Sequence, residues 1–306
     1  MGVKLLNTFL KTKFSRNIKK VHWEKFQNKK IAVDINNYMY KFLSEQAFES
    51  SIIRMCDMFL YYKITPIFVF DGKAPIEKRE EIQERKKIRT ETKHLYNKEK
   101  NILTEKELIE MRRKIVKVTS VETNKAKEIF DLYGFKHINS PSESDILCCK
   151  LVKTKKAAAC LSEDMDMFVY GCPLILRMYS NTNYITEYNL YFILNSMMID
   201  ITSFKHLCLL GNLKNNKKNI FNFYELYLQF YDNKINTTFL DYLLNHQYIS
   251  ESQLNHLNHI YTYYDIDNND VLTKCPYILF RNRKIYKSEI IRFKQNLVLQ
   301  QAFCPT

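Results

Sequence analysis

The first 190 residues alternate between short apolar runs and stretches with helical periodicity. Strand-like runs lie at residues 29–35, 65–71, 135–138, 173–179 and 184–188, and another opens the segment 157–171. Between them, apolar residues recur at helical spacing, most clearly in 3–11, 37–63 and 123–134. Strands that alternate with helices of this length predict an α/β fold built on a doubly wound parallel sheet.

Three further regions break this alternation. Residues 75–118 are helical in character and highly charged but have few apolar anchors, so the stretch is either solvated or folds over a ligand. From residue 189 to about 263 the pattern is mainly helical, and residues 274–294 are basic. We therefore expect a core at 1–195, a helical C-terminal region at 196–270 and a basic tail at 271–306.

Net charge narrows the class of partner. The 306-residue chain carries a formal charge of +14, and 46% of its residues are hydrophobic, which is enough for a sizeable core. This charge favours an anionic partner: nucleic acid, with an acidic membrane surface as the alternative. A generally lysine-rich composition would explain the same charge without any partner. No apolar run approaches the length of a membrane span, and the eight scattered cysteines form no CxxC pair, which is typical of a reduced intracellular protein without structural zinc.

Acidic residues follow the apolar runs. Asp34, Asp71 and Asp164 each come at the end of a predicted strand and before a helix. In an open α/β sheet, the carboxyl ends of the strands border the ligand crevice. Two acidic clusters, "SESD" and "EDMD", add carboxylates beside these positions. The expected set is Asp34, Asp71, Glu143, Asp145, Asp164 and Asp166.

Six converging carboxylates would repel one another unless cations neutralised them. Oxygen donors without imidazole or thiolate suit Mg²⁺ or Mn²⁺, and two such ions can hold the attacking and leaving oxygens of a phosphodiester. The competing interpretation is structural. A lone strand-end aspartate is more often a helix cap or loop residue, and the helix dipole alone favours acidic pairs at helix starts. The metal hypothesis depends on the occurrence of three strand-end aspartates and two acidic clusters together in one chain.

Five segments, in order along the chain, resemble motifs of the flap endonuclease/XPG family of structure-specific nucleases, which have a PIN-like α/β core. They are "MGVKLL", "IAVDINNYMYKFL", "PIFVFDGKAP", "KIVKVTSVETNKAKEIFDLYGFKHINSPSESD" and "LSEDMDMFVYGCPLILR". The fourth leads into the position of the family's Pro-Ser-Glu-Ala-Glu motif. The resemblance covers residues 1 to about 190. It implies a PIN-like core at 1–195, in which the segment at about 75–118 forms a helical arch.

The resemblance also implies roles for the six carboxylates. Four would hold a first Mg²⁺ ion, directly or through water, and the two from "EDMD" would hold a second. The first set is Asp34, Asp71, Glu143 and Asp145, and the second is Asp164 and Asp166. Mn²⁺ would substitute for Mg²⁺ or be preferred.

Other residues match family positions that contact the substrate. Lys78 and Arg85 match two basic residues of the arch; seven positions apart, they share a helical face that would point at the scissile phosphate. The alternative is a pair of solvated charges with acidic i,i+4 neighbours. Tyr40 matches an aromatic residue that stacks on a nucleobase, with a plain core side chain as the alternative. Gly2 matches the residue at which the N-terminal backbone approaches DNA closely.

The chain also departs from the family pattern. The family's seventh carboxylate lies in a Leu-Gly-Ser-Asp-Tyr motif, where this chain has Asn212 or Leu213. The Gly-Ile-Gly helix-hairpin signature is missing from the same region, and Lys214, Lys217 and Lys218 would contact nucleic acid there instead. No sliding-clamp motif is evident. The Lys/Asn/Tyr-rich composition and these departures indicate a divergent member of viral or other fast-evolving origin.

The leading hypothesis is a metal-dependent hydrolase, a structure-specific 5′ endo/exonuclease that cleaves flap, branched or 5′-ended DNA in replication, repair or recombination. It would act as a monomer on single-strand/double-strand junctions, away from membranes. Its location would be the nucleus, or a cytoplasmic replication site if the source is viral. One alternative is an RNase with the same site, and another is a junction-binding protein that cuts weakly because the seventh carboxylate is missing. Divalent-dependent cleavage separates the enzymes from the binding protein.

Overall fold

The computed structural model describes residues 3, 5–73, 79–178, 183–213, 218–233, 235–266 and 286–303. Contacts divide the chain into two compact units. Unit 1 comprises Met1–His22, Cys149–Lys155 and Ala159–Asp270, and unit 2 comprises Trp23–Cys148, Lys156–Ala158 and Val271–Thr306. Each unit combines segments that are distant in sequence, and the domain boundaries expected near residues 195 and 270 stay predictions.

In the described part of unit 2, three parallel strands lie in the order β2-β3-β4. They are β2 (Lys30–Asp34), β3 (Thr65–Phe70) and β4 (Lys136–Asn139), where the apolar runs predicted strands. β3 is almost fully buried, and its Phe68 stacks on Phe130 with ring centroids 3.6 Å apart. Because β2 and β3 are parallel neighbours, with Asp34 paired to Val69, their carboxyl ends lie side by side.

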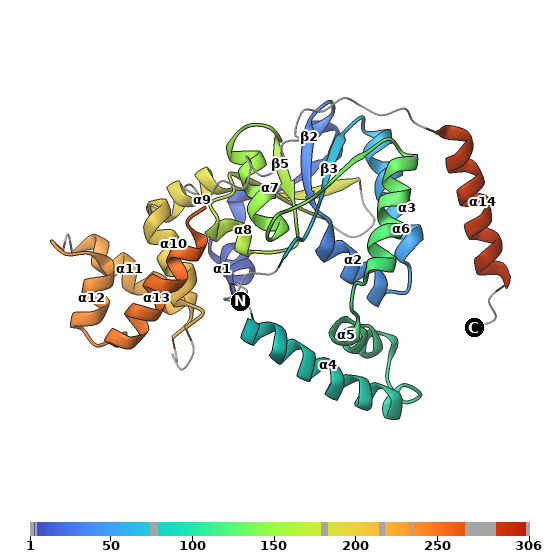
Figure 1. Ribbon diagram of the computed structural model, residues 1–306. Helices are drawn as coiled ribbons and strands as arrows, with labels where there is room; N and C mark the ends of the chain where they lie inside the picture. The colour runs from blue at the N-terminus through green and yellow to red at the C-terminus, as the bar shows by residue number, and fades with distance from the viewer. Residues whose placement is uncertain are drawn as a thin grey trace. The chain divides into compact units, whose positions relative to one another are not determined.

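Four helices of unit 2 are packed around this sheet or against one another. They are α2 (Ile35–Ser44), α3 (Phe48–Tyr61), α6 (Ser120–Leu132) and α14 (Lys287–Phe303), preceded by a short 3-10 helix at Trp23–Phe26. α3 lies between α2 and α6 in the contact order, and α14 contacts α6 (Figure 1). Lys294 of α14 donates to both carboxylate oxygens of Asp57 at 2.8 Å, and Asp57 also accepts a hydrogen bond from Tyr133. The described part of the predicted basic tail is therefore a helix held on unit 2.

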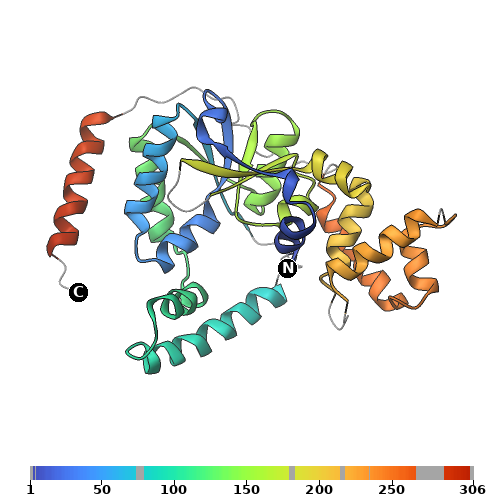
Figure 2. The ribbon, with the colours of Figure 1, turned by 180° about the vertical axis from the view of Figure 1, so that it is seen from behind.

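Helices α4 (Arg79–Glu99) and α5 (Glu105–Ile115) pack against each other as a hairpin, at the place where the resemblance predicted an arch (Figures 1 and 2). A capping box starts α5, in which the side chains of Thr104 and Glu107 each accept the other's backbone N–H. α5 contacts α2, whereas α4 exposes apolar side chains such as Leu95. A long helix with few anchors is what the highly charged sequence predicted.

Among the described residues, unit 1 has four strands in the order β1-β7-β6-β5. They are β1 (Ile18–His22), β5 (Ala159–Leu161), β6 (Leu174–Met178) and β7 (Tyr184–Asn189). β5 and β6 are parallel, as predicted, whereas β7 is antiparallel to both β6 and β1, which makes the sheet mixed. Strand β1 has no clear apolar pattern, because this short segment lies in a region dominated by basic side chains.

The other elements that the structure describes in unit 1 are helices, which confirms the mainly helical pattern predicted after residue 189. The helices are α1 (Leu6–Lys13), a 3-10 helix at Ser15–Asn17, α8 (Asp166–Val169), α9 (Leu190–Met197), α10 (Ile201–Leu210), α11 (Ile220–Asp232), α12 (Phe239–Asn245) and α13 (Glu251–Tyr264). α10 contacts α8, α11 and α13 (Figure 2). α7 (Ser144–Lys153) begins in unit 2 and ends in unit 1. Within the described ranges, no helix combines the length and apolar character needed to cross a membrane.

Candidate active site

One serine joins the two aspartates at the carboxyl ends of β2 and β3. Asp34 ends β2 and is 1% exposed, whereas Asp71 directly follows β3 and is exposed. The Ser144 hydroxyl lies 2.9 Å from Asp34 Oδ1 and 2.7 Å from Asp71 Oδ1, and the Ser144 N–H donates to the same Asp71 oxygen at 2.8 Å. Asn37 Nδ2 donates to the other Asp34 oxygen at 2.7 Å. The expected convergence of these two strand ends is therefore present in unit 2.

Ser144 is a residue that the sequence analysis missed. It is the first residue of α7, is 2% exposed and stands in "SESD" where the family motif has alanine. Its hydroxyl has a single proton, so it donates to one of the two carboxylates at a time. The only signal in the sequence was a small polar residue between two acids.

Backbone hydrogen bonds hold the loop after β3 against the loop after β4. The Ser140 N–H donates to the Phe70 carbonyl at 2.8 Å, and the Gly72 N–H donates to the Ser142 carbonyl at 2.7 Å. A Cβ atom at Gly72 would lie 1.9 Å from the Ser140 carbonyl oxygen, which is backbone and cannot swing aside. Glycine is therefore required at this position, and the close approach brings the carboxylate after β3 to the start of α7.

Glu143 and Asp145 flank the serine at the N-terminus of α7. Both are partly exposed, although Oδ1 of Asp145 is buried. The Ser140 hydroxyl donates to the Glu143 carbonyl at 2.9 Å, which fixes the backbone that enters the helix. The partial positive charge of the helix N-terminus stabilises carboxylates at this end. All four carboxylates assigned to the first metal are thus connected to Ser144. Asp34 and Asp71 accept its hydrogen bonds, and Glu143 and Asp145 are its neighbours in sequence.

Asp164 and Asp166 form the acidic group of unit 1. The Asp164 N–H donates to Ser162 Oγ at 3.0 Å, and Asp164 Oδ1 accepts the Asp166 N–H at 2.9 Å, which closes a tight turn into α8. Asp166 is 2% exposed and accepts hydrogen bonds from the Val3 N–H at 2.8 Å and the Tyr264 hydroxyl at 3.2 Å. Burial and the Asp166 carboxylate raise the pKa of Tyr264, so its hydroxyl stays protonated as a donor. The sequence carried no signal for this contact, since its partners are 98 positions apart.

The remaining predicted site residues fall into two groups. Arg85 is exposed on α4, and Tyr40 is 39% exposed on α2, which argues against Tyr40 as a plain core side chain. Lys218 Nζ lies 5.0 Å from the ring centroid of Tyr248, within cation–π range. The others lie outside the described residues: Gly2, Lys78, Lys214 and Lys217.

The donor chemistry of the predicted ligands fits a hard divalent cation. All six are carboxylates, and sites made only of oxygen donors suit Mg²⁺ and Mn²⁺. Within the described part of the chain, no three Asp, Glu, His or Cys side chains are arranged as a metal-binding group. The metal ligands therefore stay predictions.

Two family models match segments that contain both acidic groups. The XPG N-terminal domain matches residues 1–92, and the XPG I-region matches residues 134–212. The chain belongs to the flap endonuclease/XPG family. The first match contains Asp34 and Asp71, and the second contains Ser144, Asp164 and Asp166, so the assignment covers the residues described above.

Curated relatives agree with this assignment. The chain is 32% identical to flap endonuclease 1 of Encephalitozoon cuniculi (strain GB-M1) over 234 residues, which cover 69% of this chain and 66% of the relative. It is 31% identical to flap endonuclease 1 of Lachancea thermotolerans over 193 residues, which cover 58% and 49% respectively. The chain thus spans between about half and two thirds of the length of these relatives.

Solved structures of the family share the fold. The catalytic core of Rad2 in complex with DNA substrate has a TM-score of 0.68 at 20% identity, covering 94% of both chains. Flap endonuclease-1 from Methanococcus jannaschii has a TM-score of 0.60 at 19% identity, covering 95% of this chain and 91% of the other. The Holliday junction-resolving enzyme GEN1, in complex with product DNA and Mg²⁺, has a TM-score of 0.61 at 15% identity, covering 94% and 72%. The predicted PIN-like α/β fold is confirmed.

Proposed function

We propose that this protein is a structure-specific 5′ nuclease, a metal-dependent hydrolase that cleaves phosphodiester bonds in flap, branched or 5′-ended DNA. The observation that carries the proposal is the joining of Asp34 and Asp71 through Ser144 at neighbouring strand ends. Family membership supports it, as do the fold neighbours Rad2, in complex with DNA substrate, and GEN1, in complex with product DNA and Mg²⁺.

The carboxylates of unit 2 would hold one divalent ion, and those of unit 1 would hold a second. The first set is Asp34, Asp71, Glu143 and Asp145, and the second is Asp164 and Asp166. Bound Mg²⁺ or Mn²⁺ would supply an acidified water and stabilise charge on the phosphate oxygens. The chain's own contribution is orientation. The Ser144 N–H donates to Asp71, its hydroxyl donates to either Asp34 or Asp71, and Asn37 donates to the other oxygen of Asp34.

The helical arch would contribute positive charge to the reaction. Arg85 on α4, together with Lys78, would stabilise the negative charge that develops on the scissile phosphate. Arg85 lies at an exposed position on α4, which is compatible with this role. Tyr40, which is also partly exposed, would stack on a base near the cleavage site.

The N-terminal backbone would contribute to DNA binding. The Val3 N–H donates a hydrogen bond to Asp166, so the residue that follows Gly2 lies beside the acidic group of unit 1. This contact supports the close approach of Gly2 to DNA. Further backbone phosphates would be contacted by Lys214, Lys217 and Lys218.

The proposed substrate, oligomeric state and location follow from this chemistry. The substrate would be DNA with a single-strand/double-strand junction, which the protein would cut as a monomer during replication, repair or recombination. In a cell with a nucleus, the nucleus is where such DNA is found.

A cleavage panel tests the proposal. The purified protein is incubated with 5′-flap DNA, duplex DNA, single-stranded DNA and single-stranded RNA, with and without Mg²⁺ or Mn²⁺. We expect metal-dependent cleavage that is fastest on the flap. Asp164→Ala should abolish cleavage and leave flap binding intact or tighter, because it removes a ligand and a charge that repels phosphate. If the parent protein cut the flap no faster than the Asp164→Ala variant does, the proposal would be refuted. If RNA were the substrate cut fastest, the protein would be an RNase.

The missing seventh carboxylate predicts a metal preference. With fewer charged ligands, the second ion should bind weakly. The affinity for Mg²⁺, which demands near-octahedral geometry, should fall more than the affinity for Mn²⁺. We expect higher activity with Mn²⁺ and a high Mg²⁺ requirement. Asn212→Asp should lower that requirement, since Asn212 is partly exposed, whereas an aspartate in place of the buried Leu213 would destabilise the fold. Activity titrated against each metal measures this; normal saturation with Mg²⁺ in the parent protein would show that another acid completes the site.

Salt should weaken DNA binding steeply. Each phosphate contact made by a cation adds roughly −0.9 to the slope of log K against log salt concentration for duplex DNA. Arg85→Gln should reduce the slope by roughly one unit. The matched control is Arg54→Gln, since Arg54 donates to Ser51 on α3 and has no predicted role in DNA binding. Equal slopes for Arg85→Gln and the parent protein would show that Arg85 does not contact a phosphate.

A further inference from the structure

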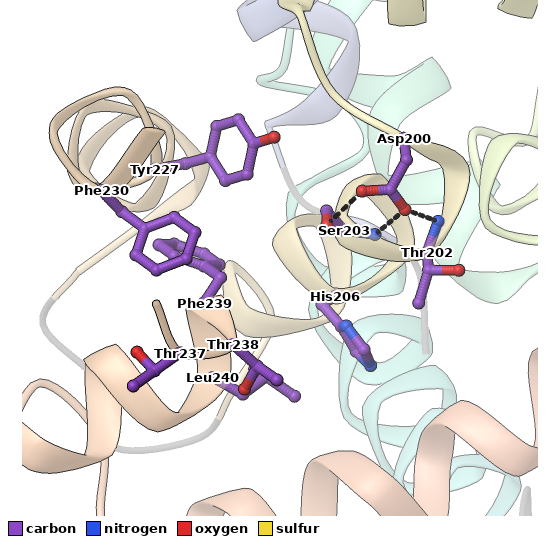
Figure 3. Close-up of a pocket in the computed structure, with 10 residues that line it drawn as sticks. All are labelled: Asp200, Thr202, Ser203, His206, Tyr227, Phe230, Thr237, Thr238, Phe239 and Leu240. Carbon is purple, nitrogen blue, oxygen red and sulfur yellow. Dashed lines mark hydrogen bonds between the residues drawn. The ribbon is translucent and has the colours of Figure 1, made fainter. Parts of the chain in front are cut away.

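A cavity of about 410 Å³ lies between α10, α11 and the start of α12 in unit 1, and its described lining includes none of the predicted active-site residues. Its volume is in the range of small-ligand pockets. Figure 3 shows that its lining is divided, with the rings of Tyr227, Phe230 and Phe239 on one side and Asp200 with Ser203 on the other. The cavity therefore offers aromatic faces opposite a carboxylate.

The aromatic side is a fixed corner. The ring of Phe239 packs 5.2 Å from Tyr227 at 84° and 5.5 Å from Phe230 at 55°, measured between centroids. Tyr227 and Phe239 are only 5% and 6% exposed, so the surrounding helices hold both rings. Non-parallel rings present π-faces in different directions, and π-faces attract cations.

The acidic side is built by the start of α10. Asp200 Oδ1 accepts the N–H groups of Thr202 and Ser203 at 2.8 and 3.0 Å, and Oδ2 accepts the Ser203 hydroxyl at 2.6 Å. Partial burial alone would raise the pKa of Asp200, but these hydrogen bonds outweigh it and lower that pKa, so the side chain is anionic at neutral pH. A carboxylate has about four acceptor positions, so by count one on Oδ2 is left for a ligand.

A second carboxylate, on α12, contacts one of the residues that line the cavity. Asp241 accepts a hydrogen bond from the hydroxyl of Thr238, which itself lines the cavity, at 2.7 Å. Of the described residues that line the cavity, Asp200 is the only one that carries a charge at neutral pH. The site is thus locally negative, although the whole chain carries a net charge of +14.

The other two titratable groups among the described lining residues, His206 and Tyr227, carry no charge at neutral pH. Burial lowers the pKa of His206, and of the neighbouring charges Asp200 acts against that shift and Lys205 with it, so the imidazole is neutral at pH 7. Lys205 itself is 6% exposed and lies 5.7 Å from the ring centroid of Tyr261 on α13. Burial, followed by the charge of Asp200, raises the pKa of Tyr227 to about 12, so its hydroxyl is neutral too.

We propose that this cavity binds a guanidinium group, such as that of an arginine side chain. Guanidinium is planar and weakly hydrated, stacks on aromatic faces and donates to a carboxylate, so it matches both sides of the cavity at once. Ammonium matches less well, because it is strongly hydrated and cannot stack. The site does not depend on nuclease activity, and its test can succeed or fail separately from that of the proposed function.

The test uses three probes with the full-length protein. They are the N-acetyl, C-methylamide derivatives of arginine, lysine and citrulline, the last being the neutral relative of arginine. Amide chemical shifts of the isotope-labelled protein follow each titration. We expect saturable binding of the arginine probe with a Kd on the order of 1 mM, as suits a single side chain. Lysine should bind at least about fivefold more weakly and citrulline at least about tenfold more weakly, because only arginine offers both charge and a stacking plane.

Variants then test whether the arginine probe binds in the cavity. Asp200→Asn removes the charge but keeps an oxygen that caps α10, since Asn and Asp are equivalent N-caps. It should weaken arginine binding at least about fivefold, and Asp232→Asn, the same change at an exposed site on α11 outside the cavity lining, should not. Phe230→Leu removes one ring and should weaken binding as well, which keeps the test decisive if Asp200→Asn disturbs α10. Absence of arginine binding, equal binding of citrulline or lysine, or equal effects of Asp200→Asn and Asp232→Asn would each overturn the proposal.

Discussion

Asparagine in place of Asp71 is expected to lower kcat/KM for flap cleavage by at least about 100-fold, more than the loss of an outer-shell partner of a metal site usually costs. The change removes one negative charge from the strand end beside Asp34. It keeps the Oδ1 atom that accepts from the N–H and hydroxyl of Ser144. Because Asp71 is exposed and its hydrogen bonds can persist, the free energy of unfolding should hardly change.

Steady-state cleavage of a 5′-flap substrate measures this effect, with flap binding and thermal unfolding measured alongside. Asp232→Asn is the matched control, because Asp232 is an exposed aspartate on α11 and has no predicted catalytic role. Cleavage by Asp71→Asn within a factor of about three of the control would show that the carboxylate after β3 takes no part in metal binding.

Alanine in place of Gly72 is expected to destabilise unit 2 by about 2–3 kcal/mol, as overpacking does in a well-packed region. The added Cβ would lie 1.9 Å from the Ser140 carbonyl oxygen and 2.9 Å from the carbonyl carbon of Pro141, so the two loops would have to separate. That separation would also break the hydrogen bond from the Gly72 N–H to Ser142. Since these loops carry Asp71 and lead into α7, cleavage should fall together with stability.

Thermal unfolding of Gly72→Ala should show a midpoint lower by roughly 5–10 °C. Lys73→Ala is the control for stability, because it changes the next residue, which is exposed, without adding an atom near the second loop. If Gly72→Ala unfolded at the same temperature as Lys73→Ala, the close approach of the two loops would not exist in solution.

Local patterns were sufficient to predict most of the elements. The apolar runs predicted β2, β3, β4, β5, β6 and β7 within a few residues. The reason is clearest for β2, β3 and β5, because a buried parallel strand is continuously apolar. The charged, weakly apolar stretch at 75–118 contains α4 and α5. Strand β1 escaped prediction, since its two lysines are exposed and only its neighbour β7 makes it a strand.

The positions of Asp34, Asp71 and Asp164 could also be predicted from the sequence alone. Asp34 ends β2, Asp71 directly follows β3 and Asp164 lies three positions after β5, so each stands at or near the carboxyl end of its strand. Five ordered motifs then indicated the family, which the matched family models confirmed. The identity of the six carboxylates as metal ligands remains a prediction from that resemblance.

Tertiary structure decided the long-range partners of the acids. Ser144 joins two carboxylates that precede it by 110 and 73 positions, and Asp166 holds Val3 from 163 positions away. Hydrogen bonds of this reach depend on which strands are neighbours and on how closely two loops approach. Periodicity describes only which face of an element is buried, so the sequence determined where each acidic residue stands along its strand, and the packing of distant segments determined its partners.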